Sequence, residues 1–313
     1  MKTKSVYMIN GFLEAGKSQF IAFTIAQNYF QIKGTTLLIV CEEGEVEYSP
    51  ELLAKTRTVV EVIEDEADFN TTKLGQLERK VKPDRIIIEY NGMWNFKNCK
   101  LPWNWRCEQQ ITVIDGATFP MYYSNMRSLF TEMVRNSEMI IFNRCDNVRE
   151  DLPTYRRNVK AVNASADVVF EDSNGEIDEI FEEDLPYDLT QDEIVLDNNT
   201  YGIWYLDCME HAERYFGKRL VMQTLVMHPD KFPKGYFIPG RMAMTCCADD
   251  MAFLGYACEY SEADSLKDKD WINLTATLTK EYFSDYKGEG PVLHAISVEK
   301  LDEQPKDPVI SFG

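Results

Sequence analysis

The sequence predicts an α/β protein in which a domain with a mostly parallel sheet is followed by a small β-rich domain. Apolar runs alternate with helical patterns up to about residue 170, which is typical of strands buried on both faces of a parallel sheet. A glycine-rich GxxxxGKS loop joins the first of these strands to a helix. Beyond residue 200, short alternating strands separated by turn residues predict an OB-like barrel or a sandwich.

The length of the chain and changes in its residue composition suggest where these parts begin and end. The 313 residues exceed one typical domain, so we expect an α/β domain over 1–182, an acidic linker over 183–205 and a β-rich domain over 206–313. The acidic stretch 171–199 predicts a charged, solvated helix and linker. The strands expected from apolar runs or alternation are 5–9, 36–40, 85–88, 111–114, 139–142, 219–227, 271–278 and 292–298.

The loop at residues 11–18 reads GFLEAGKS, between an apolar strand and an amphipathic helix. This context disfavours a chance match in a glycine-containing turn, and it predicts a P-loop NTPase domain. Glycines let successive N–H groups point at phosphate oxygens, Lys17 would reach the β- and γ-phosphates, and Ser18 would hold Mg²⁺. The candidate nucleotide-binding residues of this segment are Gly11, Glu14, Ala15, Gly16, Lys17, Ser18 and Gln19.

A second polar segment, Asn143-Arg144-Cys145-Asp146, follows the apolar strand at 139–142 and is a variant of the NKxD element. An Asp146 carboxylate can accept both N1–H and N2–H of guanine, whereas adenine offers no matching donor pair. The segment therefore favours GTP over ATP, with Asn143, Arg144 and Asp146 as base-binding candidates. Arg144 replaces the usual Lys, and an ordinary Asn/Asp turn after a strand remains the alternative.

Two further strand ends carry carboxylates. Glu89 ends the buried strand at 85–88, where it can hold Mg²⁺ directly or through water, and the N–H of Gly92 can sense the γ-phosphate. With Lys17, these are the candidate catalytic residues. Glu42 follows the strand at 36–40 and is a further Mg²⁺ candidate in a first switch, although a solvated acidic loop explains it equally well.

The formal net charge of −19 argues against binding to nucleic acid or to an anionic membrane. No run of about 18 apolar residues predicts a membrane span, and the N-terminus leads into a strand without a signal sequence, so we expect a cytoplasmic protein. The eight cysteines show no repeating framework, which in a reducing compartment predicts mostly buried thiols. No nucleophilic Ser/His/Asp or Cys/His arrangement is evident.

Taken in order, six segments resemble the CobW-like P-loop GTPases, relatives of the HypB and UreG metal-insertion proteins. The segments are GFLEAGKS, CEEGEV, IIIEYNG, ITVIDGATF, IIFNRCD and AVNASA, and the resemblance covers about residues 4–182. It implies GTP and Mg²⁺ as cofactors, phosphate and Mg²⁺ binding by the loop, switch roles for Glu42 and Glu89, and guanine recognition by Asn143 and Asp146. It also implies that Asn163 lies near the base, and that a homodimer is possible.

The sequence departs from that family pattern in three places. Glu14 replaces the usual glycine, as in heterotrimeric G-protein α subunits, and Phe12 stands where MinD-like ATPases carry a second lysine. The CxCC metal motif is missing, because residues 59–80 contain no cysteine. Three thiolates are what a borderline ion such as Zn²⁺ needs, so metallochaperone activity does not transfer with the resemblance.

The C-terminal part resembles the small C-terminal domain of the YcgQ family, which accompanies YcgR-type predicted permeases. The resemblance rests on RMAMTCCADD at 241–250, Gly255 and the Trp271 strand, and covers about residues 215–310. Cys246 and Cys247 are candidate ligands for Zn²⁺ or another transition metal, together with Cys258, Cys208, His211, His228 or His294. Buried apolar cysteine is the favoured alternative.

The tryptophan-rich segment 93–106 either packs in a seam between domains or forms a partner patch. The leading hypothesis is a Mg²⁺-dependent GTPase of low turnover that switches a C-terminal β domain, in metal homeostasis or with a membrane permease partner or metal-dependent client. The alternatives are a nucleotide-gated assembly module with negligible turnover and an ATP-using P-loop protein.

Overall fold

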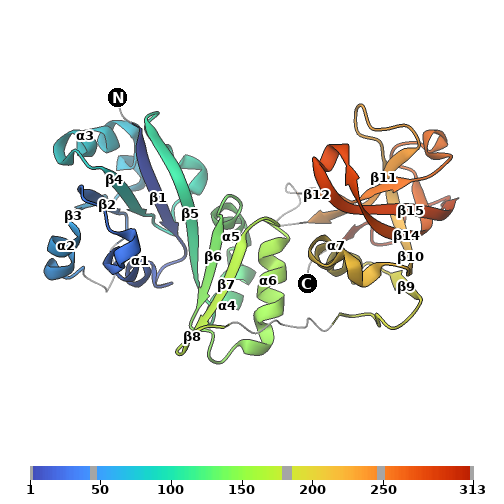
Figure 1. Ribbon diagram of the computed structural model, residues 1–313, viewed down its shortest axis with the longest axis horizontal. Coiled ribbons are helices and arrows are strands. Elements are labelled where there is room, and N and C mark those ends of the chain that lie inside the picture. The colour runs from blue at the N-terminus through green and yellow to red at the C-terminus, as the bar shows by residue number, and fades with distance from the viewer. Residues whose placement is uncertain (1–2, 43–47, 178–184, 245–250, 311–313) are drawn as a thin grey trace. The chain divides into compact units, whose positions relative to one another are not determined.

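The computed structural model describes residues 3–42, 48–177, 185–244 and 251–310 (Figure 1). The chain divides into two compact units, Met1–Ile180 and Phe181–Gly313. Each unit has its own sheet and is described by itself.

The first unit is built on an eight-stranded sheet of order β3-β2-β4-β1-β5-β6-β7-β8, in which only the short β8 is antiparallel. This confirms the mostly parallel sheet. The strands are β1 (Lys4–Asn10), β2 (Thr36–Val40), β3 (Thr58–Val62), β4 (Arg85–Glu89), β5 (Trp105–Asp115), β6 (Met139–Asn143), β7 (Asp167–Asp172) and β8 (Gly175–Glu176).

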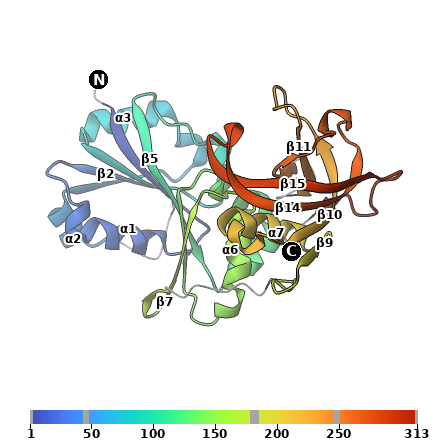
Figure 2. The ribbon, with the colours of Figure 1, turned by 45° about the vertical axis from the view of Figure 1, so that its right-hand side comes forward.

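Helices connect these strands in the manner of right-handed crossovers. They are α1 (Lys17–Ala26), α2 (Pro50–Thr56), α3 (Thr71–Val81), α4 (Phe119–Asn125), α5 (Arg127–Val134) and α6 (Leu152–Lys160), with short 3-10 turns at Asn28–Phe30, Glu66–Asp68, Phe96–Asn98 and Arg149–Asp151. In Figure 2, α1 and α2 lie below the strands and α3 lies above them.

The two faces of this sheet have separate cores. Ile21 and Ile25 of α1 pack with Ile9 on one face, while Leu74 and Leu77 of α3 pack on the other. The alternation along β1, where Val6 and Met8 face α3, accounts for the division. The carboxyl ends of the parallel strands lie together at one edge of the sheet, and the glycine loop follows β1 at this edge.

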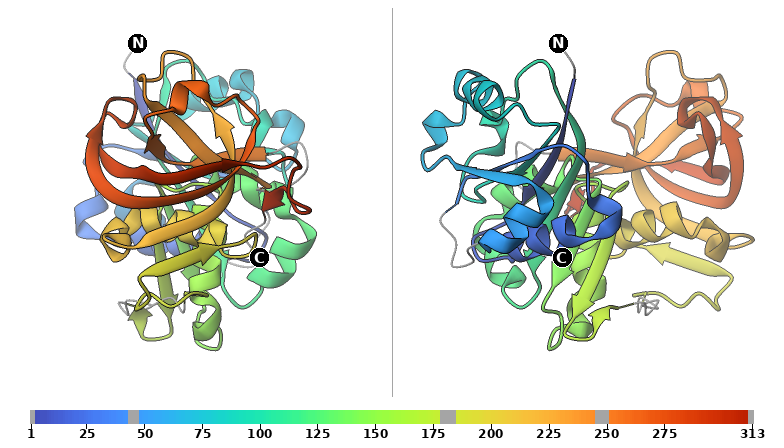
Figure 3. Two further views of the ribbon diagram at one scale, coloured as in Figure 1. Left: turned by 90° about the vertical axis from the view of Figure 1, so that its right-hand side faces the viewer. Right: turned by 60° about the vertical axis from the view of Figure 1, so that its left-hand side comes forward.

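The second unit contains a closed ring of five strands, β10-β11-β13-β15-β14, in which β14 pairs back to β10 and β10 also pairs with β11. Ring closure makes it an OB-like barrel and not a sandwich. Figure 3 shows the strong curvature of its long red strands β14 and β15. The elements are β9 (Glu193–Leu196), β10 (Arg219–Met227), β11 (Tyr236–Met244), β12 (Met251–Gly255), β13 (Ala257–Glu259), β14 (Trp271–Phe283), β15 (Gly288–Lys300), β16 (Val309–Ile310), α7 (Tyr201–Glu210) and 3-10 turns at Ala212–Tyr215, Ala263–Ser265 and Ser284–Tyr286.

The acidic stretch 171–199 differs from its prediction. Its described residues, 171–177 and 185–199, contain no helix, and β9 pairs parallel with β10. The reason is visible in the side chains, because Ile194 and Leu196 are buried while Glu193 and Val195 point outward. The acidic residues around it do not indicate a strand, so the short alternating strand β9 was not predicted.

The tryptophan-rich segment packs mainly within the first unit. Trp94 and Phe96 contact the buried ring of Tyr90, and the indole N–H of Trp105 donates to Glu78 at 2.8 Å. Trp103 is the exception, with 84% of its surface exposed.

Candidate functional site

The loop between β1 and α1 has a backbone that requires glycine at two positions. Gly11 has φ 142°, and a Cβ there would lie 2.0 Å from the carbonyl oxygen of Val113. Gly16, which precedes the first turn of α1, has φ 93°. Because both angles lie in a region that other residues rarely adopt, the loop conformation depends on these glycines. It leaves the N-terminus of α1 at the carboxyl edge of the sheet.

Lys17 is buried and folds back over this loop. Its Nζ donates to the carbonyl oxygens of Gly11 at 2.9 Å and Phe12 at 2.8 Å. The same atom forms an ion pair of 2.6 Å with Glu42, which follows β2. A buried ammonium needs such partners, since removing it from water is costly. The loop thus holds a desolvated cation that an anion can approach.

Glu89, at the end of β4, is 2% exposed and lies beside Ser18. Its Oε1 accepts from the Ser18 hydroxyl at 2.5 Å, and its Oε2 accepts from the Tyr48 hydroxyl at 2.6 Å. Burial raises the pKa of Glu89, while the two hydroxyl donors and Lys17 oppose that rise. Hydroxyl and carboxylate oxygens are the ligands that Mg²⁺ prefers, so the donor set of Ser18, Glu89 and Glu42 fits this ion.

Gly92 lies against the phosphate loop. A Cβ on Gly92 would stand 2.0 Å from the carbonyl oxygen of Gly11. The preceding residue, Asn91, donates its side-chain amide to the carbonyl oxygen of Cys41 at 3.0 Å. The segment after β4 is therefore fitted between the end of β2 and the loop, and no larger side chain can replace Gly92 without moving one of them.

The segment after β6 is tied directly to the phosphate loop. Asn143 Nδ2 donates to the carbonyl oxygen of Ala15 at 2.8 Å, and Arg144 Nη1 donates to that of Glu14 at 3.0 Å. Arg144 also forms a 2.5 Å ion pair with Asp115, at the end of β5. In the described part of the chain, Asn143 Oδ1 is buried and has no donor. An amide oxygen in this position is available to a ligand.

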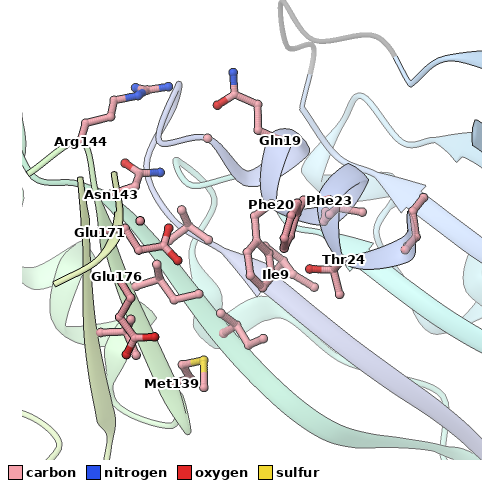
Figure 4. A pocket seen from close by; sticks show the side chains of 18 of the residues that line it. Ile9, Gln19, Phe20, Phe23, Thr24, Met139, Asn143, Arg144, Glu171 and Glu176 are labelled. Carbon is pink, nitrogen blue, oxygen red and sulfur yellow. The ribbon is translucent and has the colours of Figure 1, made fainter. Parts of the chain in front are cut away.

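Asp146 is exposed and accepts from the backbone N–H of Ser173 at 3.0 Å. Hydrogen bonds from Ser173 lower the pKa of Asp146, which keeps the carboxylate ionised as an acceptor. Figure 4 shows the adjoining cavity, of about 880 Å³, with Gln19, Asn143 and Arg144 at one end. Gly16, Asp146 and Ser173 also line it.

Three participants were not singled out from the sequence. Tyr48 and Asp115 are held against predicted site residues, and Ser173 belongs to the turn after β7. Asp115 could have been predicted by the pattern that indicates Glu89, because it is also a carboxylate at the end of an apolar strand. The Asn174-Gly175 dipeptide marks the turn that follows Ser173. Tyr48 had no comparable signal.

Asn163 lies elsewhere, which corrects the expectation that it is near the base. Its Nδ2 donates to the carbonyl oxygens of Val134 and Ser137, both at 2.8 Å, before the start of β6. Asn143 is at the other end of β6, roughly 13 Å from the first residue of that strand at about 3.3 Å per residue. Asn163 thus fastens the end of α5 at the amino edge of the sheet.

The metal candidates of the second unit are not brought together in the described residues. Cys246 and Cys247 lie outside the described ranges. Burial raises the pKa of Cys208 and of Cys258, which favours their neutral thiol forms. His294 is held between Glu259 and Glu281, 2.9 Å from each. Across the described ranges there is no cluster of three His, Cys, Asp or Glu side chains suited to a metal ion.

A comparison with protein families identifies the part of the chain that carries this site. Residues 5–170, more than half of the chain, match the family model described as CobW/HypB/UreG, nucleotide-binding domain. The chain belongs to the CobW/HypB/UreG family. Its residues 173–310 match a second model, the DUF1980 C-terminal domain, in the region that resembles the YcgQ family. The family match confirms the resemblance drawn from the motifs of the first unit.

Three solved structures are also similar to this chain. Zn(II)-bound YjiA GTPase from E. coli is 19% identical with a TM-score of 0.42, over 57% of this chain and 60% of YjiA. HypB from Archaeoglobus fulgidus is 15% identical with a TM-score of 0.40, over 55% and 82% of the two chains. HypB from Helicobacter pylori in complex with nickel is 12% identical with a TM-score of 0.35, over 54% and 80%.

No curated protein matches the chain. None of the helices within the described ranges is both long and apolar enough to cross a bilayer.

Proposed function

We propose that this protein is a Mg²⁺-dependent GTP-binding protein that hydrolyses GTP slowly and couples its nucleotide state to the C-terminal barrel. The observation that carries the proposal is the connected site at the carboxyl edge of the first sheet. There the desolvated Lys17, the Ser18–Glu89 pair and the Asn143–Ala15 contact surround one glycine loop. Membership of a nucleotide-binding family supports it.

The loop residues would hold the phosphates. Lys17 would exchange its contacts with Glu42 and two carbonyl oxygens for phosphate oxygens, while the N–H groups from Glu14 to Gln19 surround them at the N-terminus of α1. When bound, Mg²⁺ would neutralise charge that develops on the phosphates. Ser18 and Glu89 would hold it, and Glu42, released from Lys17, could join them.

Asp146 would give the site its preference for guanine. Its ionised carboxylate can accept two N–H groups from guanine, and Asn143 Oδ1 is open to a further donor. Arg144 would pack its stem along the base while its guanidinium stays paired with Asp115. An ATP-using protein would have no use for this acceptor.

Hydrolysis would depend on positioning, because the described residues around the loop show no histidine in contact with it. Gly92, which touches Gly11, would place its N–H beside the γ-phosphate and orient water there. The close fit of Gly92 also supplies a switch, since any shift of the loop on hydrolysis would displace the segment after β4.

The cellular role proposed here is metal homeostasis or service to a membrane permease, in the cytoplasm. It is supported by the match of residues 173–310 to the DUF1980 C-terminal domain and by family membership. A metal-dependent client and a homodimer are proposed from family membership alone. Because the CxCC motif is missing, a transition-metal site is proposed on Cys246 and Cys247 instead.

Nucleotide binding tests the proposal first. Fluorescent GTP and ATP analogues are titrated into wild-type protein, Lys17→Ala and Asp146→Asn, with Glu150→Gln as an exposed carboxylate control. Hydrogen bonds to a charged group are worth about 1.5–3 kcal/mol, and 1.4 kcal/mol is tenfold, so Asp146→Asn should weaken GTP binding ~10- to 100-fold. Glu150→Gln should leave it unchanged. Equal affinity for GTP and ATP overturns the guanine assignment.

Turnover and metal content separate the remaining alternatives. GTP hydrolysis is measured with and without Mg²⁺, Zn²⁺, Co²⁺ or Fe²⁺, and Lys17→Ala serves as the blank. A Mg²⁺-dependent rate that Lys17→Ala abolishes supports a GTPase, whereas binding without turnover supports a nucleotide-gated assembly module. Elemental analysis of wild-type and Cys246→Ser/Cys247→Ser protein tests the transition-metal site.

A further inference from the structure

Among the described residues of the first unit, part of one sheet face has no helix over it. Connections that move from β1 to β2 and β3 place α1 and α2 on one face, and those that move back across the sheet place α3 to α6 on the other. Within the described residues no helix follows β7 to cover β5, β6 and β7 on the α1 side. Parallel sheets are normally covered on both faces, so this region is unusual.

The uncovered region is an apolar groove between α1 and the β7–β8 hairpin. It belongs to the 880 Å³ cavity shown in Figure 4. Its floor and one wall are made of Phe20, Phe23, Ile111, Met139, Ile141 and Val169. Phe23 is 65% exposed, which is costly for a phenylalanine on a helix that otherwise packs on the sheet. An apolar surface of this kind marks an interaction site.

The opposite wall of the groove is acidic. Glu171 and Glu176 are directly opposed in the β7–β8 pair, and Figure 4 shows both on the far side from Phe23. Like charges opposed across strands are destabilising. In the part of the chain that the structure describes, neither carboxylate has a cationic partner, and the lining's basic side chain, Arg144, is paired with Asp115. A cation arriving from outside would relieve this repulsion.

We propose that this groove binds a basic amphipathic helix of a partner protein. A helix is about 10 Å across and would occupy the position of a missing crossover helix, with its apolar face on the strands. Lysine or arginine along one flank would meet Glu171 and Glu176. A second copy of this chain is a poor occupant of this groove, because its net charge of −19 gives it no excess of cations to set against Glu171 and Glu176.

The groove also adjoins the proposed nucleotide site. Helix binding in the groove goes beyond the proposed function, and it does not require that a nucleotide binds. Gly16, Gln19 and Asn143 line the same cavity at its other end. A helix docked against Phe20 and Phe23 would therefore contact α1 one to two turns from the phosphate loop.

The test uses full-length protein and a fluorescein-labelled synthetic 18-residue peptide of leucine and lysine, with leucines on one helical face. Two control peptides are a scrambled sequence of equal composition and a version with glutamate in place of lysine. Fluorescence anisotropy is expected to show binding of the amphipathic lysine peptide at least tenfold tighter than either control. Equal binding of the scrambled peptide would mean simple charge attraction and would overturn the proposal, as would no binding.

Variants locate the binding. Glu171→Gln/Glu176→Gln and Phe23→Ser are each expected to weaken binding at least fivefold. The matched controls, Glu262→Gln/Glu289→Gln and Trp103→Ser, change exposed residues elsewhere and should have no effect. All are surface changes, and circular dichroism checks folding. Equal losses in the control variants would refute the site.

Hydrogen exchange provides a readout independent of the variants. The lysine peptide should protect residues 20–29 and 167–176, and protection confined to other segments contradicts the proposal.

Discussion

Replacing Glu89 by glutamine is expected to stabilise the ligand-free protein and to reduce the further stabilisation that Mg²⁺ and GTP provide. The substitution keeps the size of the side chain, and Ser18 and Tyr48 can still hydrogen bond to the amide. It removes a carboxylate that is 2% exposed and whose pKa is raised by burial. Without ligand, the variant should therefore unfold at a higher temperature than the wild type at pH 7.5.

With ligand, the advantage of the variant should shrink, because Mg²⁺ and GTP stabilise the wild type more than the variant. A ligand at 100 times its Kd stabilises the folded state by about 2.7 kcal/mol. Losing one charged contact, worth about 1.5–3 kcal/mol, weakens binding ~10- to 100-fold, which lowers that stabilisation to roughly 0.4–1.4 kcal/mol. At about 2–4 °C per kcal/mol, Mg²⁺ and GTP should raise the Tm of the wild type by about 5–11 °C and that of Glu89→Gln by about 1–6 °C.

The pH dependence separates charge burial from a packing effect. A carboxyl with a raised folded-state pKa binds more protons when folded, so its stabilising effect is complete below the unfolded pKa and is lost as pH rises through the folded pKa. The wild type should lose this stability with rising pH, and Glu89→Gln should not. Differential scanning fluorimetry between pH 5 and pH 8 should show the advantage of the variant growing with pH.

A ligand-free variant that is less stable than the wild type at pH 7.5 would refute this reasoning. An advantage that is constant with pH would show that packing, and not the buried charge, is responsible. Glu150→Gln, an exposed carboxylate, is the control and should follow the wild type at every pH.

Gly92→Ala should abolish GTP hydrolysis and weaken binding, because its Cβ would meet the Gly11 carbonyl oxygen, whereas Gly75→Ala on α3 has room and should stabilise by up to about 1 kcal/mol. Normal turnover in Gly92→Ala would contradict the contact. Asn163→Ala should cost about 1–3 kcal/mol in unfolding free energy and leave GTP affinity unchanged; a selective loss of affinity would return Asn163 to the base site. Timed alkylation with mass spectrometry should label the exposed Cys107 well before the buried Cys41, Cys145, Cys208 and Cys258.

The sequence predicted the first unit well where the signal is local. The glycine loop, the strand ends at Glu89 and Asn143 and the alternation of strands and helices all follow from neighbours within a few residues. The structure brings Lys17, Ser18, Glu89 and Asn143 to one edge because parallel strands end together. Their roles stay predictions, since position alone does not establish binding.

Features that depend on long-range pairing were not predictable. Asn163 follows a helix and precedes a strand, so its sequence neighbours do not reveal which edge of the sheet it occupies. The choice between barrel and sandwich depended on whether β10 pairs with β11 as well as with β14. The strand β9 was missed because charged residues flank the two buried side chains that define it.

The contacts between the segment after β6 and the glycine loop bear on how fast a bound nucleotide would leave the proposed site. Asn143 and Arg144 donate hydrogen bonds to the carbonyl oxygens of Ala15 and Glu14, so the two parts of the site are directly joined to each other. A nucleotide held at both ends by one rigid body behaves as a chelated ligand, because release of one end leaves it poised to rebind. Residence time should therefore be long, and exchange should require a movement that separates these two segments.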